Sequence, residues 1–213
     1  MFGRRRGADA GASTGSEGSS GRILVVGLGN PGSRYAATRH NIGFEVAAEL
    51  SRRWDLPKAK QRFKGEITEG RVRPGGPRVA VLLPQTFMNE SGSSAGTARG
   101  QLKVPLEEVV VIHDEIDLPF GEIKAKLGGG AAGHNGLKSL RQGFGDTDFW
   151  RVRVGVGRPE STDPEIVSAY VLGKFAESRD EVRELVEDAA KEAERLVEQI
   201  SAEQDDPLGE VMS

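Results

Sequence analysis

Two short runs of consecutive apolar, mostly β-branched residues constrain the fold of this chain more than any other feature. They are Ile23–Val26 and Val109–Ile112. A strand that is apolar on both faces is typical of the centre of a sheet that helices cover on both sides. The glycine-rich stretch that starts at Gly27 ends the first run. The chain is therefore expected to fold around a sheet with buried central strands.

The remaining segments alternate between strand and helix patterns. A first amphipathic helix is predicted from about Phe44 to Trp54, and a long helix with an acidic face is predicted over about 177–200. Further strands are predicted at 63–72, 79–83, 122–127 and 150–156. Strands interleaved with helices predict the α/β class, as a single domain with a mixed twisted sheet flanked by helices.

Composition sets the boundaries of this domain and excludes several classes of protein. Residues 1–20 are mostly Gly, Ser, Ala and Arg, so they are interpreted as a disordered leader, followed by the domain at 21–200 and an acidic flexible tail at 201–213. The chain has no cysteine, which excludes disulfides and thiol nucleophiles. No apolar run approaches the ~20 residues that span a bilayer. We expect a cytoplasmic protein without a membrane segment.

The charged residues are unevenly distributed, although the whole chain carries a net charge of only -3. Residues 160–213 contain 16 acidic and 5 basic residues, a net charge of -11. Because the totals are 32 acidic and 29 basic, residues 1–159 contain 16 acidic and 24 basic residues, a net charge of +8. A body that binds a polyanion would have this asymmetry, and so would an ordinary domain beside an acidic solvated helix.

The loop after the first buried run, Gly27–Gly32, formally matches the glycine fingerprint of dinucleotide-binding folds. That fingerprint requires a helix that starts inside the loop, whereas here Pro31 lies within it and the helical pattern starts only near Asn41. Glu45 and Glu49 stand at about the right distance for a ribose-binding acid, but they fall on the helix. Nicotinamide or flavin binding is therefore disfavoured, and no cofactor is predicted.

Two polar clusters at the ends of predicted elements supply a histidine and a carboxylate. His40 lies between the first loop and the first helix, and Asp114 follows the second buried run. Ligands of open α/β sheets bind at the edge of the sheet where the carboxyl ends of the parallel strands lie. A carboxylate that is hydrogen-bonded to one ring nitrogen orients the imidazole, so the other nitrogen can take a proton from water. His40 and Asp114 are therefore predicted to be a general base and its orienting partner.

Other hydrolytic chemistries fit the sequence less well. There is no Gly-x-Ser-x-Gly motif, and the serines near Ser91 are interpreted as part of a glycine-rich turn. The three histidines, His40, His113 and His134, are dispersed and form no His-x-x-x-His pair, so no metal site is predicted. A water nucleophile that needs no metal is the simplest interpretation.

Two further turns carry asparagines, Asn89 after Phe87 and Met88, and Asn135 after His134. Amide groups offer both donors and acceptors, which suits a developing oxyanion or the recognition of a carbonyl group. Asparagine is also common in turns for purely structural reasons. The pattern leaves both interpretations open.

Taken together, five motifs resemble those of bacterial-type peptidyl-tRNA hydrolases in sequence, order and spacing. They are Gly27–Gly32, Tyr35 with Thr38–Asn41, Thr86–Asn89, His113–Glu115 and Gly130–Gly136. The resemblance covers about residues 22–175 and is only compositional along the last helix. It implies a monomeric α/β enzyme without metal or cofactor that hydrolyses the ester between the peptide and the tRNA 3′ ribose in peptidyl-tRNA, and so recycles tRNA from stalled or dropped-off peptides.

The same resemblance implies roles for individual residues. His40 would be the catalytic base, Asp114 its stabilising partner, and Asn30 would help to distinguish blocked from free aminoacyl-tRNA. Lys126 and Arg153 would clamp the 5′ phosphate of the tRNA. The end of the substrate would be contacted by Tyr35, Phe87, Met88, Asn89, His134 and Asn135.

The chain departs from this family pattern after Gly157, where a basic loop is expected and the sequence reads Arg-Pro-Glu-Ser-Thr-Asp. The departure affects how the acceptor stem of the tRNA is held, and it leaves the catalytic residues untouched. The alternative from another class is a non-catalytic RNA-binding module. Such a module gives no reason for the His40 and Asp114 pair.

Overall fold

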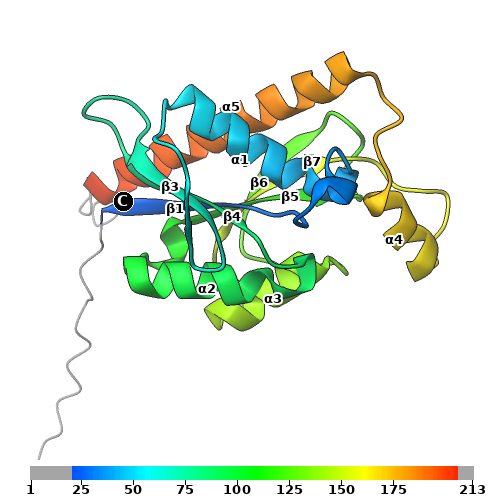
Figure 1. Ribbon diagram of the computed structural model, residues 1–213, viewed down its shortest axis with the longest axis horizontal. Coiled ribbons are helices and arrows are strands. Elements are labelled where there is room, and N and C mark those ends of the chain that lie inside the picture. Colours follow the sequence, from blue (N-terminus) through cyan, green and yellow to red (C-terminus); the bar gives the residue numbers. More distant parts are fainter. Residues whose placement is uncertain (1–20, 206–213) are drawn as a thin grey trace, which may run out of the picture.

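The computed structural model describes residues 21–205, so the predicted leader at 1–20 and the end of the predicted tail, 206–213, lie outside the described residues. A seven-stranded sheet in the order β2-β3-β4-β1-β5-β7-β6 forms its centre (Figure 1). The strands are β1 (Arg22–Gly27), β2 (Lys60–Arg62), β3 (Gly65–Arg71), β4 (Arg78–Pro84), β5 (Val109–Glu115), β6 (Ile123–Leu127) and β7 (Trp150–Gly155).

The sheet is mixed, as predicted. β1 pairs in parallel with β4 and β5, and β5 pairs in parallel with β7. The outer pairs β2–β3, β3–β4 and β6–β7 are antiparallel. Because the four central strands share one direction, the loops that follow them converge at one edge of the sheet, where ligands of α/β proteins bind.

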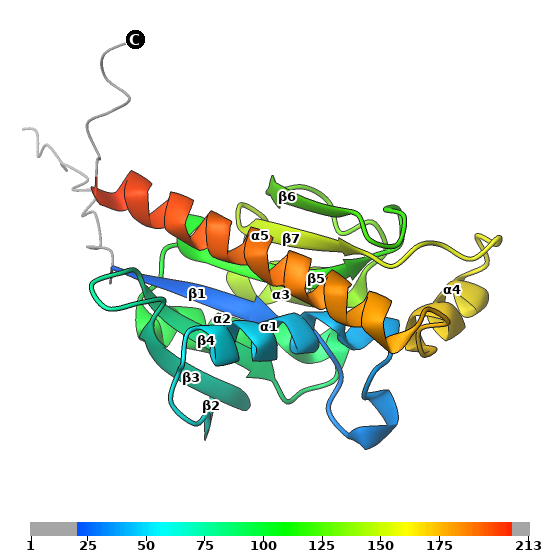
Figure 2. The same ribbon diagram turned by 90° about the horizontal axis from the view of Figure 1, so that it is seen from above.

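Helices cover both faces of the sheet (Figures 1 and 2). α1 (Ile42–Arg53) and α5 (Arg179–Asp205) pack on one face, and α2 (Ser91–Leu102) and α3 (Asn135–Phe144) pack on the other. The two apolar runs contribute to both cores, because alternate residues of a strand face opposite sides. α5 continues five residues beyond the predicted end at 200. No helix among residues 21–205 is long and apolar enough to cross a membrane.

The interpretation of the serines near Ser91 as a glycine-rich turn was wrong, because these residues begin α2. The helix has no apolar stripe, since it packs on α3 through small residues. A Cβ atom on Gly92 would lie 1.9 Å from the carbonyl oxygen of Ser139, and one on Gly96 would lie 2.5 Å from that of Gly143. The two helices therefore meet backbone to backbone, and a pattern of large apolar residues does not mark their contact.

The turn predicted around Asn135 is likewise a helix start. Asn135 is the first residue of α3, and His134 is its N-cap. Two further elements were not predicted, β2 and α4 (Pro164–Leu172). α4 does carry a helix-start signal, because Asp163 caps it by accepting from the backbone N–H of Glu165 and Pro164 occupies the first turn.

Candidate active site

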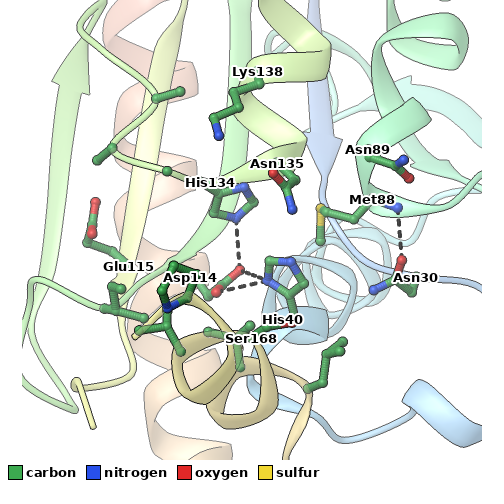
Figure 3. Close-up of a pocket in the computed structure, with 18 of the residues that line it drawn as sticks. Asn30, His40, Met88, Asn89, Asp114, Glu115, His134, Asn135, Lys138 and Ser168 are labelled. Atoms are coloured by element: carbon green, nitrogen blue, oxygen red, sulfur yellow. Dashed lines mark hydrogen bonds and ion pairs between the residues drawn. The ribbon is translucent and has the colours of Figure 1, made fainter. Parts of the chain in front are cut away.

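A cavity of about 690 Å³ opens at the edge of the sheet where the parallel strands end (Figure 3). It contains the predicted site residues except Lys126 and Arg153. Those that line it are Asn30, Tyr35, His40, Phe87, Met88, Asn89, Asp114, His134 and Asn135. Its walls come from the loops after β1, β4 and β5, from the start of α3, and from α4. The loops thus bring together residues that lie more than a hundred positions apart in the sequence.

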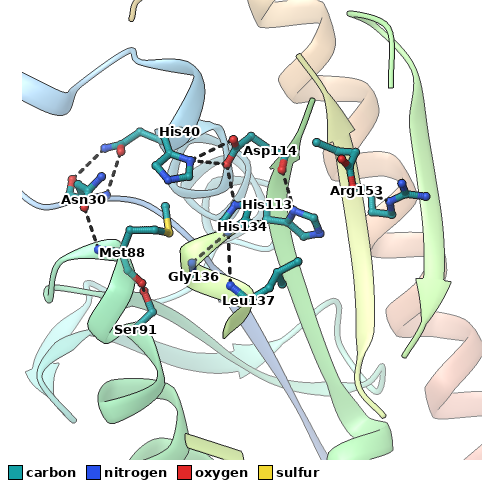
Figure 4. Close-up of polar contacts among 12 residues, drawn as sticks. Asn30, His40, Met88, Ser91, His113, Asp114, His134, Gly136, Leu137 and Arg153 are labelled. Carbon is teal, nitrogen blue, oxygen red and sulfur yellow. Dashed lines mark hydrogen bonds and ion pairs between the residues drawn. The ribbon is translucent and has the colours of Figure 1, made fainter. Parts of the chain in front are cut away.

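His40 and Asp114 meet in this cavity, as predicted. The Nδ1 atom of His40 lies 2.8 Å and 3.0 Å from the two carboxylate oxygens of Asp114, and both side chains are buried (Figure 4). Burial alone lowers the pKa of His40, but the charge and hydrogen bond of Asp114 outweigh it, so the pKa is raised above 6.5. The Nε2 atom has no hydrogen-bond partner within residues 21–205. The hydrogen bond to Asp114 therefore orients the ring and leaves Nε2 free at a residue that lines the cavity, as a general base requires.

Asp114 receives a second hydrogen bond, from His134. The Nε2 atom of His134 lies 3.0 Å from the Asp114 oxygen that His40 also contacts. Burial alone raises the pKa of Asp114, but the two imidazoles outweigh it and hold the pKa far below its usual range. Asp114 is therefore a carboxylate near neutral pH, and it accepts a hydrogen bond from each ring.

The backbone of α3 determines which nitrogen of His134 carries the proton. Nδ1 of His134 accepts from the backbone N–H groups of Gly136 and Leu137, at 3.1 Å and 3.4 Å, and so caps the helix (Figure 4). A nitrogen that accepts has no proton, so the proton of the neutral ring lies on Nε2, which donates it to Asp114. His134 lines the cavity, but both of its ring nitrogens are hydrogen-bonded within the protein. The sequence analysis assigned His134 only a contact with the substrate.

His40, Asp114 and His134 are also the residues that could surround a metal ion, because their ligand atoms lie within 4.8 Å of one another. Hydrogen bonds account for this proximity. Asp114 bridges the two rings through protons, and the second nitrogen of His134 is taken by α3. His40, Asp114 and His134 therefore form a hydrogen-bonded triad of side chains.

Asn30 is held by two neighbours that leave its amide NH2 group for the cavity. Its Oδ1 accepts from the backbone N–H of Met88 at 2.8 Å, which fixes the orientation of the amide. The side chain of Asn41 makes two hydrogen bonds with the backbone of Asn30. Its Oδ1 accepts from the N–H of Asn30, and its Nδ2 donates to the carbonyl oxygen of Asn30, each at 2.9 Å. Asn41 was not predicted as a site residue, although it directly follows His40 in the motif Thr38–Asn41. It connects the turn that carries His40 to the loop that carries Asn30.

His113 stands behind the triad, on the opposite face of β5 from Asp114. It is buried, its Nδ1 donates to the backbone carbonyl of Asp114 at 2.8 Å, and its ring packs edge-on against His134 with centroids 5.1 Å apart. Burial lowers its pKa to about 3. The ring is therefore neutral in the folded protein near neutral pH, whereas in an unfolded chain it titrates near 6.5.

We predict that His113 makes the fold sensitive to acid. Because the unfolded chain binds a proton between pH 6.5 and about 3 and the folded chain does not, stability falls as the pH falls through this window. At pH 5 the cost is about 2 kcal/mol. The advantage of wild type over His113→Asn should therefore shrink by this amount between pH 7.5 and pH 5 in urea unfolding. A difference that is independent of pH would contradict the prediction.

The rim of the cavity carries exposed aromatic surface. Tyr35 and Phe87 pack edge to face, with ring centroids 6.5 Å apart, and Phe87 is 54% exposed. Asn89 and Asn135 line the same cavity. The two residues expected at the 5′ phosphate lie away from it, on β6 and β7. Arg153 donates to Glu115 at 3.0 Å, and Lys126 stands opposite Arg151 rather than Arg153.

A further wall of the cavity is α4, which Arg39 attaches to the turn that carries His40. The guanidinium donates to the carbonyl oxygens of Tyr170 and Lys174, at 3.2 Å and 2.8 Å, and lies 4.1 Å from the centre of the Tyr170 ring. α4 lines the cavity with Pro164, Val167, Ser168, Val171 and Leu172. Sequence reasoning missed this wall because α4 lacks a clear apolar stripe.

Fold and site together define an α/β protein with a histidine–carboxylate pair in a cavity at the strand ends. Residues 24–207 match the model of the family described as peptidyl-tRNA hydrolase. A peptidyl-tRNA hydrolase of Syntrophotalea carbinolica is 48% identical over 82% of this chain and 90% of its own length. One of Azorhizobium caulinodans is 47% identical over 78% of this chain and 79% of its own length.

Solved structures agree with this match. The crystal structure of peptidyl-tRNA hydrolase from Acinetobacter baumannii is 34% identical and superposes with a TM-score of 0.71, covering 87% of this chain and 97% of that one. The chain therefore belongs to the peptidyl-tRNA hydrolase family. The family match reaches residue 207, so it extends along α5, beyond the 22–175 over which the motifs carry the resemblance.

Proposed function

We propose that this protein hydrolyses the ester bond between the carboxyl end of a peptide and the 3′ ribose of tRNA, using water that His40 activates. The observation that carries the proposal is the hydrogen bond between His40 Nδ1 and Asp114, which leaves Nε2 without a partner at a residue that lines the cavity. Family membership supplies the substrate class. The activity would release tRNA from peptides that are stalled or have dropped off.

The reaction follows from the position of the ring. Nε2 of His40 takes a proton from water while the water oxygen attacks the ester carbonyl carbon, and Asp114 stabilises the imidazolium that forms. The tetrahedral intermediate then breaks the bond to the ribose 3′ oxygen, which receives the proton from His40. The products are a peptide carboxylic acid and tRNA with a free 3′ hydroxyl. A positioned base contributes about 10²- to 10⁴-fold, and orientation of the water adds to it.

Asn30 supports a preference for peptides over free amino acids. Its oxygen is used by the backbone of Met88, so the amide presents donors to the cavity. A blocked amino group offers a carbonyl oxygen that accepts from such a donor, whereas a free α-ammonium offers only further donors. The free aminoacyl ester would therefore meet a donor where it needs an acceptor. Asn89 and Asn135 line the same cavity and would contact the same end of the substrate.

The remaining contacts with the tRNA would lie at the rim of the cavity and outside it. Tyr35 and Phe87 offer flat aromatic surface at the rim for the terminal base of the tRNA. Lys126 and Arg153 would hold the 5′ phosphate, with Arg153 already fixed by Glu115. Since one chain supplies every wall of the cavity, we infer that the enzyme acts as a monomer, and its substrate class points to the cytoplasm.

The direct test is turnover by the purified chain on N-acetylaminoacyl-tRNA, with the free aminoacyl-tRNA as the matched substrate. We expect many turnovers per enzyme on the acetylated substrate and far fewer on the free one. Binding of both substrates without hydrolysis would contradict the proposal and identify an RNA-binding module instead.

A further inference from the structure

α4 lies at one end of the molecule, beyond the helices that cover the sheet, and it forms a wall of the cavity (Figures 1 and 2). It is weakly packed, because Val171 is the only buried residue among its nine, whereas α1 buries five of its twelve. Most helices in proteins are stabilised by the packing of an apolar face. α4 therefore depends on other contacts to keep its place beside the cavity.

These contacts come from η2 (Arg39–Asn41), the 3-10 turn that carries His40 and the element that α4 contacts most. The backbone N–H of Arg39 donates to the carbonyl oxygen of Gly173 at 3.1 Å, and the residue before Arg39 pairs with Lys174 in an isolated antiparallel bridge. The residues that follow α4 are thus joined to the start of the turn that carries His40.

The guanidinium group of Arg39 completes this attachment. Its Nη1 donates to the carbonyl oxygens of Tyr170 and Lys174, and its Cζ lies 4.1 Å and 5.5 Å from the centres of the Tyr170 and Phe175 rings. Tyr170 belongs to the last turn of α4, where the carbonyl groups carry a partial negative charge. A cation at this end therefore stabilises the helix by its charge as well as by its hydrogen bonds.

Arg39 is only 7% exposed, and none of the ion pairs found within residues 21–205 involves it. Burial of a charge is costly, and here carbonyl groups and aromatic rings supply the compensation. All of these partners belong to α4 or to the three residues that follow it. Removal of the guanidinium therefore weakens the attachment of α4 and no other hydrogen bond of the site.

We propose that Arg39 is a positioning residue, which holds α4 in place as a wall of the cavity and thereby raises the affinity of the enzyme for the end of its substrate. The proposal rests on the proposed function, because the cavity must hold that end. The five residues of α4 that line the cavity carry no charge. α4 therefore contacts an uncharged part of the substrate rather than a phosphate group.

The test compares Arg39→Met, which keeps an unbranched side chain but removes the guanidinium, with Arg39→Lys, which keeps the charge. The matched control is Arg99→Met. Arg99 also donates to a backbone carbonyl, that of Val104 at 3.4 Å, and its Cζ lies 5.8 Å from the centre of the Phe144 ring, but it does not line the cavity. Hydrogen exchange of backbone amides is measured on the free proteins, and kcat and KM are measured on N-acetylaminoacyl-tRNA.

Arg39→Met should speed up hydrogen exchange in α4 by about a hundredfold, because it loses two hydrogen bonds from a charged donor, each worth roughly tenfold or more. Exchange in β1 and β5 should not change. The backbone contacts after α4 remain, as does the hydrogen bond from the Tyr170 hydroxyl to Val156 at 2.7 Å, so the protein should stay folded. Arg39→Lys should fall between Arg39→Met and wild type, and Arg99→Met should leave exchange in α4 unchanged.

The KM of Arg39→Met should rise by about tenfold, as expected if α4 is in place in about a tenth of the free molecules. Its kcat should stay within about twofold of wild type, because neither hydrogen bond of the guanidinium within residues 21–205 involves His40 or Asp114. The ratio of the two KM values should be the same at low and high salt, since no phosphate contact is lost. A ratio that falls as salt rises would show that Arg39 binds RNA and would overturn the proposal.

Unchanged exchange in α4 of Arg39→Met would also overturn the proposal, and so would equal effects of Arg39→Met and Arg99→Met or a loss confined to kcat. Normal hydrolysis by wild type would then leave the proposed function standing. Failure of wild type to hydrolyse any N-blocked substrate would instead remove the proposed function. Faster exchange in α4 of Arg39→Met would still support the positioning role in that case, because it is measured without substrate.

Discussion

His40→Asn should reduce kcat/KM on peptidyl-tRNA by about 10²- to 10⁴-fold, which is the share of a positioned general base. The asparagine amide can still donate to Asp114, so the buried carboxylate keeps a partner, but no nitrogen remains to take a proton from water. The variant should therefore fold and bind tRNA. Steady-state kinetics on N-acetylaminoacyl-tRNA, with tRNA affinity measured alongside, checks both statements.

The loss should appear in kcat rather than in KM, because the missing interaction is made in the transition state. Activity of His40→Asn within a few-fold of wild type would show that another group activates the water. Loss of tRNA affinity in parallel with activity would instead indicate a damaged fold.

Asp114→Asn should be about as damaging as the loss of the base itself, by roughly 10³- to 10⁴-fold. Asp114 accepts a hydrogen bond from both His40 and His134, whereas an asparagine offers one acceptor and one donor group. An amide N–H that faces Nδ1 of His40 favours the tautomer with its proton on Nε2, the atom that has to act as the base. α3 fixes the tautomer of His134, so that ring cannot adapt to relieve the conflict.

The matched control for this charge change is Asp117→Asn, three residues further along the chain. Asp117 forms an exposed ion pair with Arg158 and makes no contact with either histidine of the triad. Its loss should change the rate by little, since exposed pairs contribute about 0–1 kcal/mol. Equal rates for Asp114→Asn and Asp117→Asn would mean that the buried pair has no part in catalysis.

The central strands and the His40–Asp114 pair could be predicted from the sequence because both follow from local patterns. Four successive apolar residues are buried on both faces of a sheet, and parallel strands end at a common edge. Polar residues that follow such strands then lie together, although 74 positions separate these two. The family motifs add the identities of the residues around them.

The parts that were not predicted depend on contacts between distant segments. α2 has no apolar stripe, because Gly92 and Gly96 allow its backbone to touch α3. The role of His134 depends on which atoms face its two nitrogens, and those belong to α3 and β5. Arg39 is buried by α4, a helix that only its capping residues indicate. None of these partners is close in the sequence.

The pH dependence of kcat/KM, in wild type and in Asp114→Asn, tests the central claim most directly. The base acts when it is neutral, and Asp114 raises the pKa of His40 above 6.5, so wild-type activity should rise with pH through an apparent pKa above that value. Without the carboxylate, burial lowers the pKa of His40, and the residual activity of Asp114→Asn should rise at lower pH than that of wild type. An activity limb at the same pH in both proteins, or a wild-type rate that does not change between pH 5 and 9, would contradict the assignment of His40 as the base.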